Sequence, residues 1–203
     1  MAKLIEIMGP VAVGKTTIIR NLKEYYKDSK VYGFNDISGK DPYYVYWKIF
    51  HSKKFKYIIT EKRVLYSFIL KNKGINKTIS DDSILFAQKT SEEEGVEKVL
   101  EEFSNIYMMF NLKCDENILL KRMKLKRKAD TGKYYNYLNS EEDKLRAIKN
   151  VMNYIDTISK IFGKRGIFVY DIDTSLEIEE CVNKVKNILD YHRDMYNLEI
   201  CII

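Results

Sequence analysis

The sequence predicts an α/β fold: a three-layer sandwich in which a five-stranded parallel sheet carries helices on both faces, with a helical lid. Apolar, strand-like runs alternate with amphipathic helical stretches, which is the order that a parallel sheet requires. A glycine-containing loop, residues 9–16, joins the first of these runs to the first helical stretch. The 203 residues show no linker and no repeat, so we expect one domain, residues 1–203, with the lid at about 122–140.

Local signals place the elements of the first half of the chain. Residues 3–8 form a short apolar run, and residues 42–51 begin with Pro42, which suits the first turn of a helix. Apolar residues in 61–72 recur at helical spacing, and Gly74 marks the end of that helix. In chain order we expect strand 3–8, helix 16–27, strand 30–34, helix 42–51, helix 61–72, strand 77–81 and helix 92–103.

The second half gives clearer signals. Residues 105–112 are the clearest strand, and Asp115 is a suitable N-cap for a helix over 115–124. Ser140 opens another helix, because acidic residues follow it in the first turns. The last two elements are expected as strand 166–171 and helix 175–191.

Composition narrows the function classes. The net charge of +6 suits an anionic ligand and permits nucleic acid, but no dense basic face interleaved with aromatics favours a nucleic-acid partner. No apolar run approaches the ~18 residues of a membrane span. The three cysteines are widely spaced, so we expect reduced thiols and neither zinc nor disulfides. We therefore expect a cytoplasmic protein without a membrane partner; a homodimer is compatible with the sequence.

The loop carries the most specific motif. Residues 9–16 read Gly-Pro-Val-Ala-Val-Gly-Lys-Thr, a complete G-x-x-x-x-G-K-[ST] motif between a strand and a helix. Its backbone N–H groups converge on phosphates, Lys15 reaches the β- and γ-phosphates, and the Thr16 hydroxyl can bind Mg²⁺. We predict binding of ATP with Mg²⁺ through Gly9, Val11, Ala12, Val13, Gly14, Lys15, Thr16 and Thr17.

Carboxylates follow two of the expected strands, at the edge where ligands bind in parallel sheets. After 30–34, Asp36 is the first candidate and Asp41 the second for positioning or deprotonating an acceptor hydroxyl, although both could be turn or cap residues. After 77–81, Asp81 is preferred over Asp82 as a partner of Mg²⁺; the alternative is a helix N-cap.

Two later segments complete the predicted site. Residues 121–128 are densely basic, and their cations, with Arg122 and Arg127 as catalytic candidates, could close over a triphosphate as a lid. The alternative is a solvated helix face. Residues 171–175 form a turn that either caps the last helix or contacts the nucleotide base, with Asp173 as the candidate contact.

Taken together, these residues resemble the P-loop nucleoside and nucleotide kinases, among them the deoxynucleoside kinase and thymidylate kinase superfamily. The resemblance implies the P-loop NTPase fold. Residues 113–127 are similar to the family's strand–helix–lid passage, whose arginines close on the phosphates, and 171–175 to its turn beneath the adenine. Asp81-Asp82-Ser83 stands where the family carries Glu-Arg-Ser or Asp-Arg-Tyr, so Arg63 or a lid residue would replace the missing arginine.

The leading function is therefore ATP-dependent transfer of the γ-phosphoryl group to a small acceptor, a nucleoside or nucleoside monophosphate. One alternative is a kinase that acts on RNA or DNA ends, which the charge permits. Another is a P-loop NTPase switch without an acceptor. Residues 36–39 match a GTPase-like D-x-x-G, but no N-K-x-D guanine motif follows, which argues against a GTPase.

Overall fold

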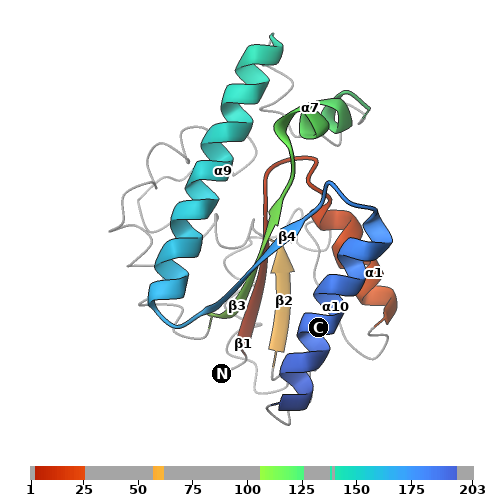
Figure 1. Cartoon of the computed structure of the whole chain (residues 1–203), viewed down its shortest axis with the longest axis vertical. Helices are drawn as coiled ribbons and strands as arrows, with labels where there is room; N and C mark the ends of the chain where they lie inside the picture. The colour runs from red at the N-terminus through yellow and green to blue at the C-terminus, as the bar shows by residue number, and fades with distance from the viewer. Residues whose placement is uncertain (1–2, 26–56, 62–105, 126–137, 139, 196–203) are drawn as a thin grey trace, which may run out of the picture.

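One parallel sheet forms the centre of the protein (Figure 1). The computed structural model describes residues 3–25, 57–61, 106–125, 138 and 140–195. Within these residues four strands pair in the order β2-β1-β3-β4, and each pairing is parallel. The strands are β1 (Lys3–Met8), β2 (Tyr57–Glu61), β3 (Ile106–Lys113) and β4 (Phe168–Asp173).

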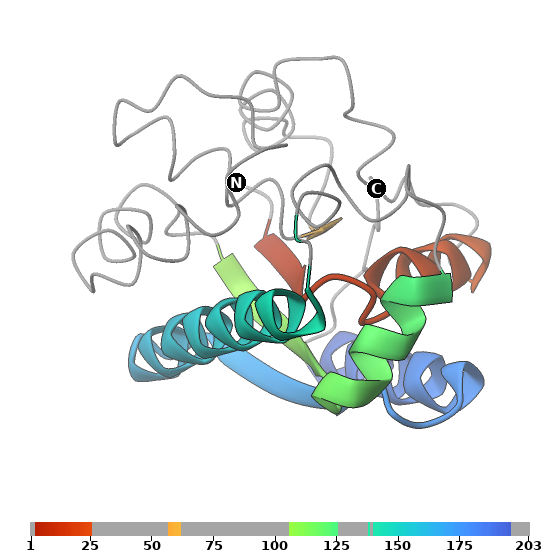
Figure 2. The same cartoon turned by 90° about the horizontal axis from the view of Figure 1, so that it is seen from above.

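Helices cover both faces of this sheet, as the sequence predicted. The described helices are α1 (Lys15–Tyr25), α7 (Glu116–Leu125), α9 (Glu141–Lys164) and α10 (Ile178–Met195). Seen from above, α9 lies on one face, and α1 and α10 lie on the other (Figure 2). Helix α7 sits beyond the carboxyl ends of β1 and β3 (Figure 1). No helix in the described part of the chain is both long and apolar enough to span a membrane.

A core cluster of buried residues lies between the sheet and the α1/α10 layer. Ile5 and Ile7 of β1 belong to it, because alternate residues of a strand point to the same face. They pack with buried residues from the other elements: Ile18, Ile19, Leu22, Met108, Phe110, Leu112, Val185 and Leu189. Glu6 and Met8 point to the opposite face and are buried as well. Burial on both faces is typical of a central strand in a parallel sheet, and it fixes the position of the loop that follows β1.

Most predicted elements in the described residues are confirmed within a few residues. Strand 3–8 is β1, strand 105–112 is β3, and strand 166–171 appears two residues later as β4. Ser140 is the N-cap of α9, where its hydroxyl accepts a hydrogen bond from the backbone N–H of Asp143 at 3.0 Å. The expected elements at 30–34, 42–51, 77–81 and 92–103 lie outside the described residues.

One predicted boundary was wrong. The helix expected over 61–72 does not include Glu61, because this residue ends β2 and pairs with Ile7 of β1, while residues 62–72 lie outside the described part of the chain. The sequence Tyr-Ile-Ile-Thr-Glu is rich in β-branched residues, but five residues are too few for a clear periodic signal. Its pairing partner is about fifty positions earlier in the chain, and this distant contact decides the conformation.

Candidate phosphate-binding site

The loop between β1 and α1 has the backbone conformation that its glycines predict. Gly9 has φ +153° and Gly14 has φ +103°, and Ala12 adopts φ +61°, a left-handed conformation that is uncommon for a residue other than glycine. Such backbone turns allow successive N–H groups to face one concave space, which is how a loop of this kind surrounds an anion. The loop lies at the carboxyl end of β1, where ligands bind in open parallel sheets.

At Gly9, the first residue of the loop, there is no room for a side chain. A Cβ atom at Gly9 would lie 2.7 Å from Val13 Cγ1 and 2.9 Å from the carbonyl oxygen of Leu112, at the end of β3. Contacts under 3.0 Å require a shift of the neighbouring atoms, and the carbonyl belongs to a buried strand. The absence of a side chain therefore lets the loop pass directly against β3.

Lys15 places a positive charge inside the loop. Its side chain is only 8% exposed, and Nζ donates hydrogen bonds to the carbonyl oxygens of Gly9 at 3.0 Å and Pro10 at 2.7 Å. Two carbonyl dipoles stabilise the ammonium but do not neutralise its charge. A buried cation of this kind interacts strongly with an anion that enters the loop, because little water screens the interaction.

The start of α1 adds to this positive field. Helix α1 begins at Lys15, and the N–H of Ile18 closes its first turn on the carbonyl of Gly14 at 3.0 Å. The first turn carries no acidic residue, while the side chains of Thr16 and Thr17 are exposed. A helix N-terminus attracts anions, and no carboxylate within its own first turn competes for that position. The predicted loop residues 9–17 thus lie together at the carboxyl end of β1.

The neighbouring strand brings a carboxylate residue to the same edge. β2 runs parallel to β1 and ends at Glu61, which pairs with Ile7, two residues before the loop. Glu61 was missed as a site candidate because its segment was interpreted as a helix. A signal was present: an acidic residue ends a β-branched run, as Asp81 was expected to end the strand 77–81.

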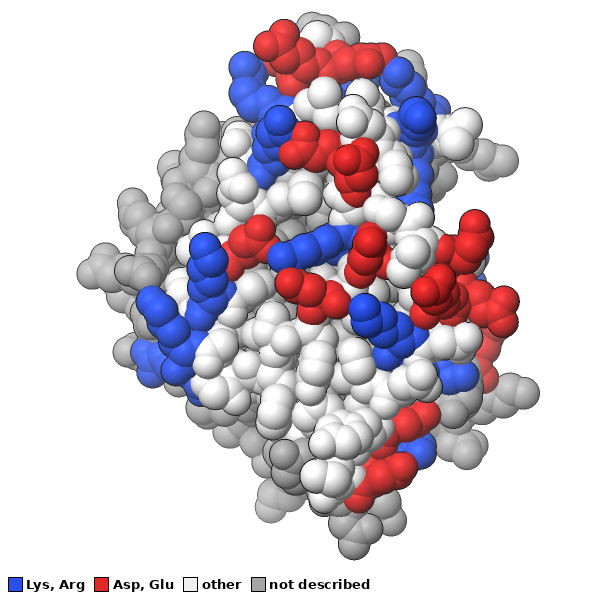
Figure 3. All heavy atoms as spheres, in the orientation of Figure 1, with Lys and Arg blue, Asp and Glu red and all other residues white. Residues whose placement is uncertain are grey.

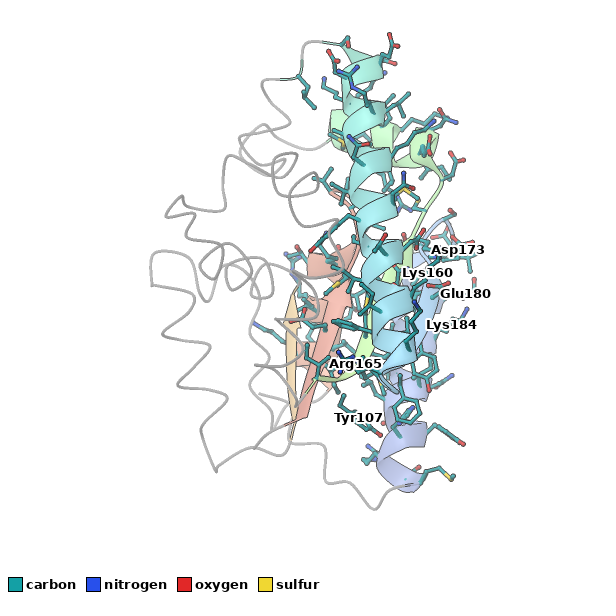
Figure 4. All side chains as sticks on the ribbon, turned by 90° about the vertical axis from the view of Figure 1, so that its left-hand side faces the viewer. Tyr107, Lys160, Arg165, Asp173, Glu180 and Lys184 are labelled. Atoms are coloured by element: carbon teal, nitrogen blue, oxygen red, sulfur yellow. The ribbon has the colours of Figure 1, made fainter. Side chains whose placement is uncertain are left out.

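The turn after β4 lies at the same end of the sheet. Figure 4 shows Asp173 toward this end and Tyr107, near the start of β3, toward the opposite end. The Asp173 carboxylate accepts a hydrogen bond from the N–H of Ser175 at 2.8 Å, and this bond holds the pKa of Asp173 below its usual value. Asp173 is exposed and ionised at neutral pH, which is compatible with either predicted role, cap or base contact.

Arg122 contacts this turn. From α7, its Nη2 donates to the carbonyl oxygen of Thr174 at 2.7 Å, and its Nη1 lies 3.6 Å from Cys114 Sγ. The sequence pattern had grouped Arg122 with the lid, whereas the structure fixes its guanidinium to the turn after β4. A hydrogen bond between residues 52 positions apart has no local signal, which is why the sequence did not indicate it.

A polar cluster beside the turn was also not predicted. Lys113 Nζ lies 3.0 Å from Asp171 Oδ2 of β4 and 3.2 Å from Asp156 Oδ1 of α9, and Asn111 Nδ2 donates to both aspartates. Burial lowers the pKa of Lys113, but its hydrogen bonds and charge attraction to Asp171 and Asp156 outweigh burial and raise the pKa. Lys113 therefore stays charged at neutral pH and ties α9 to β4.

The remaining predicted site residues lie outside the described part of the chain: Asp36, Asp41, Asp81, Asp82 and Arg127. In the described part, no three acidic, histidine or cysteine side chains gather as a metal cluster would require. The donors at the loop nevertheless fit Mg²⁺, which is typically held by a hydroxyl, substrate phosphates, water and one or two carboxylates.

The Gly9 contact leads to a testable prediction. In Gly9→Ala the new Cβ displaces the loop from β3, at a strain of about 1–3 kcal/mol, so ATP affinity measured by calorimetry should fall roughly tenfold or more. Gly166→Ala is the matched control, because Gly166 also has positive φ (+74°) but nothing lies near its Cβ position. Equal ATP affinity in the two variants would contradict the importance of this contact.

Comparison with known proteins gives structural neighbours but no sequence relatives. No family model matches the chain, and no curated protein matches it. The YorR protein of Bacillus subtilis, solved in complex with phosphorylated GDP, is 15% identical, with a TM-score of 0.53 over 95% of this chain and 98% of that one. Deoxyadenosine kinase from M. mycoides, solved with bound dATP, is 14% identical, with a TM-score of 0.52 over 93% and 99%.

At such low identity these likenesses report the fold alone. They agree with the parallel sheet and the helices on both of its faces. The chain therefore shares the fold of these two solved structures, a parallel sheet with helices on both faces.

Proposed function

We propose that the protein is an ATP-dependent kinase that transfers the γ-phosphoryl group to a nucleoside or nucleoside monophosphate. The observation that carries the proposal is the position of Lys15, whose buried ammonium lies within the loop at the start of α1. The nucleotides in the names of the two structural neighbours also support a nucleotide ligand.

The chemistry follows from this arrangement of charges. An oxygen of the acceptor attacks the γ-phosphorus, the bond from that phosphorus to the β,γ-bridging oxygen breaks, and ADP leaves. Negative charge grows on the bridging and γ-oxygens during the transfer. Lys15 would leave the two loop carbonyls and follow this charge, while the loop amides hold the β-phosphate. Arg127 would stabilise the same charge from the lid, and Arg122 would act from α7, beside the turn after β4.

Mg²⁺, when bound, would neutralise charge on the β- and γ-phosphates. Thr16 would hold it with its hydroxyl, and a carboxylate at a neighbouring strand end would assist directly or through water. Asp81 remains the candidate from the sequence, and Glu61 joins it because β2 ends beside the loop.

Asp36 would position the acceptor. If the acceptor is a hydroxyl, its proton would pass to Asp36; if the acceptor is already a phosphate, no strong base is needed and Asp36 would serve binding only. Asp173 and its turn would lie against the donor base.

The face shown in Figure 3 supports a small acceptor over a nucleic-acid end. On the face in Figure 3, lysines and arginines are interspersed with aspartates and glutamates and form no continuous basic surface among the described residues. A nucleic-acid backbone would be attracted by a continuous basic stripe.

The first test concerns Lys15. Lys15→Ala removes the cation that follows the transferred charge, so kcat should fall roughly 10²–10³-fold. Lys160→Ala, an exposed lysine on α9, is the control and should keep wild-type kcat. The measurement is ADP release with saturating ATP, Mg²⁺ and acceptor. Near-normal transfer by Lys15→Ala would exclude the proposed mechanism.

The acceptor class is tested by a panel of nucleosides, nucleoside monophosphates and oligonucleotides. We expect one nucleoside or monophosphate to stimulate ADP release well above hydrolysis by water. Stimulation by oligonucleotides alone would instead indicate a nucleic-acid end kinase. Hydrolysis that no acceptor changes would indicate an NTPase switch.

The metal carboxylate is tested by Glu61→Gln and Asp81→Asn, which preserve size and remove charge. The variant that removes the Mg²⁺ partner should raise the Mg²⁺ concentration needed for half-maximal activity several-fold, because one anionic ligand is lost. The other variant serves as its control. An unchanged Mg²⁺ requirement in both would assign the metal to other residues.

A further inference from the structure

Thr174, in the turn between β4 and α10, joins three elements. Its N–H donates to the carbonyl oxygen of Lys113 at 2.8 Å, and its hydroxyl donates to the same oxygen at 3.0 Å. Its own carbonyl oxygen accepts the 2.7 Å hydrogen bond from Arg122. The side chain is only 3% exposed. Thr174 therefore links the end of β3 to the guanidinium on α7.

Other residues of the turn also make hydrogen bonds with neighbouring elements. Ser175 Oγ lies 3.6 Å from Cys114 Sγ and accepts from the N–H of Asp115 at 3.4 Å. Cys181 of α10 donates its thiol hydrogen to the carbonyl of Asp173 at 3.3 Å, and burial raises the pKa of this thiol, which keeps it protonated. The turn thus has a defined conformation, and Arg122 is oriented by it.

The contact between Thr174 and the Lys113 carbonyl lies beside the phosphate loop. Leu112 lies against Gly9, and the next residue, Lys113, provides the carbonyl that holds Thr174. A nucleotide whose phosphates lie in the loop must extend over a neighbouring strand end. Over β3 and β4, the groups it would meet include the turn and Arg122, whose planar guanidinium has one orientation because two acceptors hold it.

We infer that Thr174 is a positioning residue that sets the affinity and base preference of the nucleotide site by holding the turn and, through it, Arg122. The inference rests on one part of the proposed function, namely that ATP occupies the loop and extends over β3 and β4. This role differs from that of the loop residues, because Thr174 acts through the side chain of Arg122.

The Thr174 hydroxyl can be removed without leaving a buried polar group unpaired. In Thr174→Val the carbonyl of Lys113 still accepts from the backbone N–H at position 174, so the variant should remain folded. Without the second bond the turn can shift, and Arg122 shifts with it. Thr174→Ser keeps the hydroxyl and should restore wild-type behaviour.

The experiment measures the dissociation constants of ATP–Mg²⁺ and GTP–Mg²⁺ by calorimetry, which needs no acceptor. For Thr174→Val we expect ATP binding to weaken ~2–10-fold, the range that one hydrogen bond supports, with a smaller ratio between the two nucleotides. Thr157→Val is the matched control, because Thr157 also donates its hydroxyl to a carbonyl, that of Asn153 at 3.0 Å within α9. It should bind both nucleotides as the wild type does.

A double-mutant cycle with Arg122→Ala identifies the route. If Thr174 acts through Arg122, Thr174→Val has no further effect on ATP affinity in the Arg122→Ala background. Additive effects overturn the inference, as does a Thr174→Val protein with lower thermal stability but unchanged affinities. Wild-type protein that binds ATP yet phosphorylates no acceptor would refute the proposed function and leave this test intact. Wild-type protein that binds neither nucleotide refutes both.

Discussion

The close contact of Gly9 with the end of β3 is the constraint on which the site depends. The loop leaves β1 between Val13 and the Leu112 carbonyl, in a space that excludes even a methyl group. This path brings the carbonyls of Gly9 and Pro10 around Lys15. It also starts α1 in a direction that buries its apolar side against the sheet and α10. A loop held further from β3 would have neither the enclosed ammonium nor this docking of the helix.

The path of the loop also has an electrostatic consequence. Burying the Lys15 ammonium costs desolvation energy, and its hydrogen bonds to the Gly9 and Pro10 carbonyls offset part of that cost. A phosphate that entered the proposed site would interact with this ammonium where little water screens the attraction. The resting loop therefore holds the positive charge beside the proposed phosphate position before a nucleotide binds.

Local signals explain which parts of this arrangement were predictable. The loop, α1 and the Ser140 N-cap are encoded within a few neighbouring residues, and the structure has them as expected. β2 and the Arg122–Thr174 bond depend on partners about fifty positions away, so composition and periodicity did not predict β2, began a helix at its last residue, and placed Arg122 on a lid. Parallel sheets bring distant strand ends together, and for that reason their sites are built largely from contacts with no local sequence signal.

The end of β3 shows how such contacts are organised. Three consecutive residues serve different parts of the site: Leu112 borders the phosphate loop, the carbonyl of Lys113 holds Thr174, and Cys114 accepts from Arg122. The side chain of Lys113, kept charged by its aspartates, also fixes α9 and β4 to the same point. Because one buried strand orders all of these groups, the two ends of a bound nucleotide would be positioned against a single rigid reference.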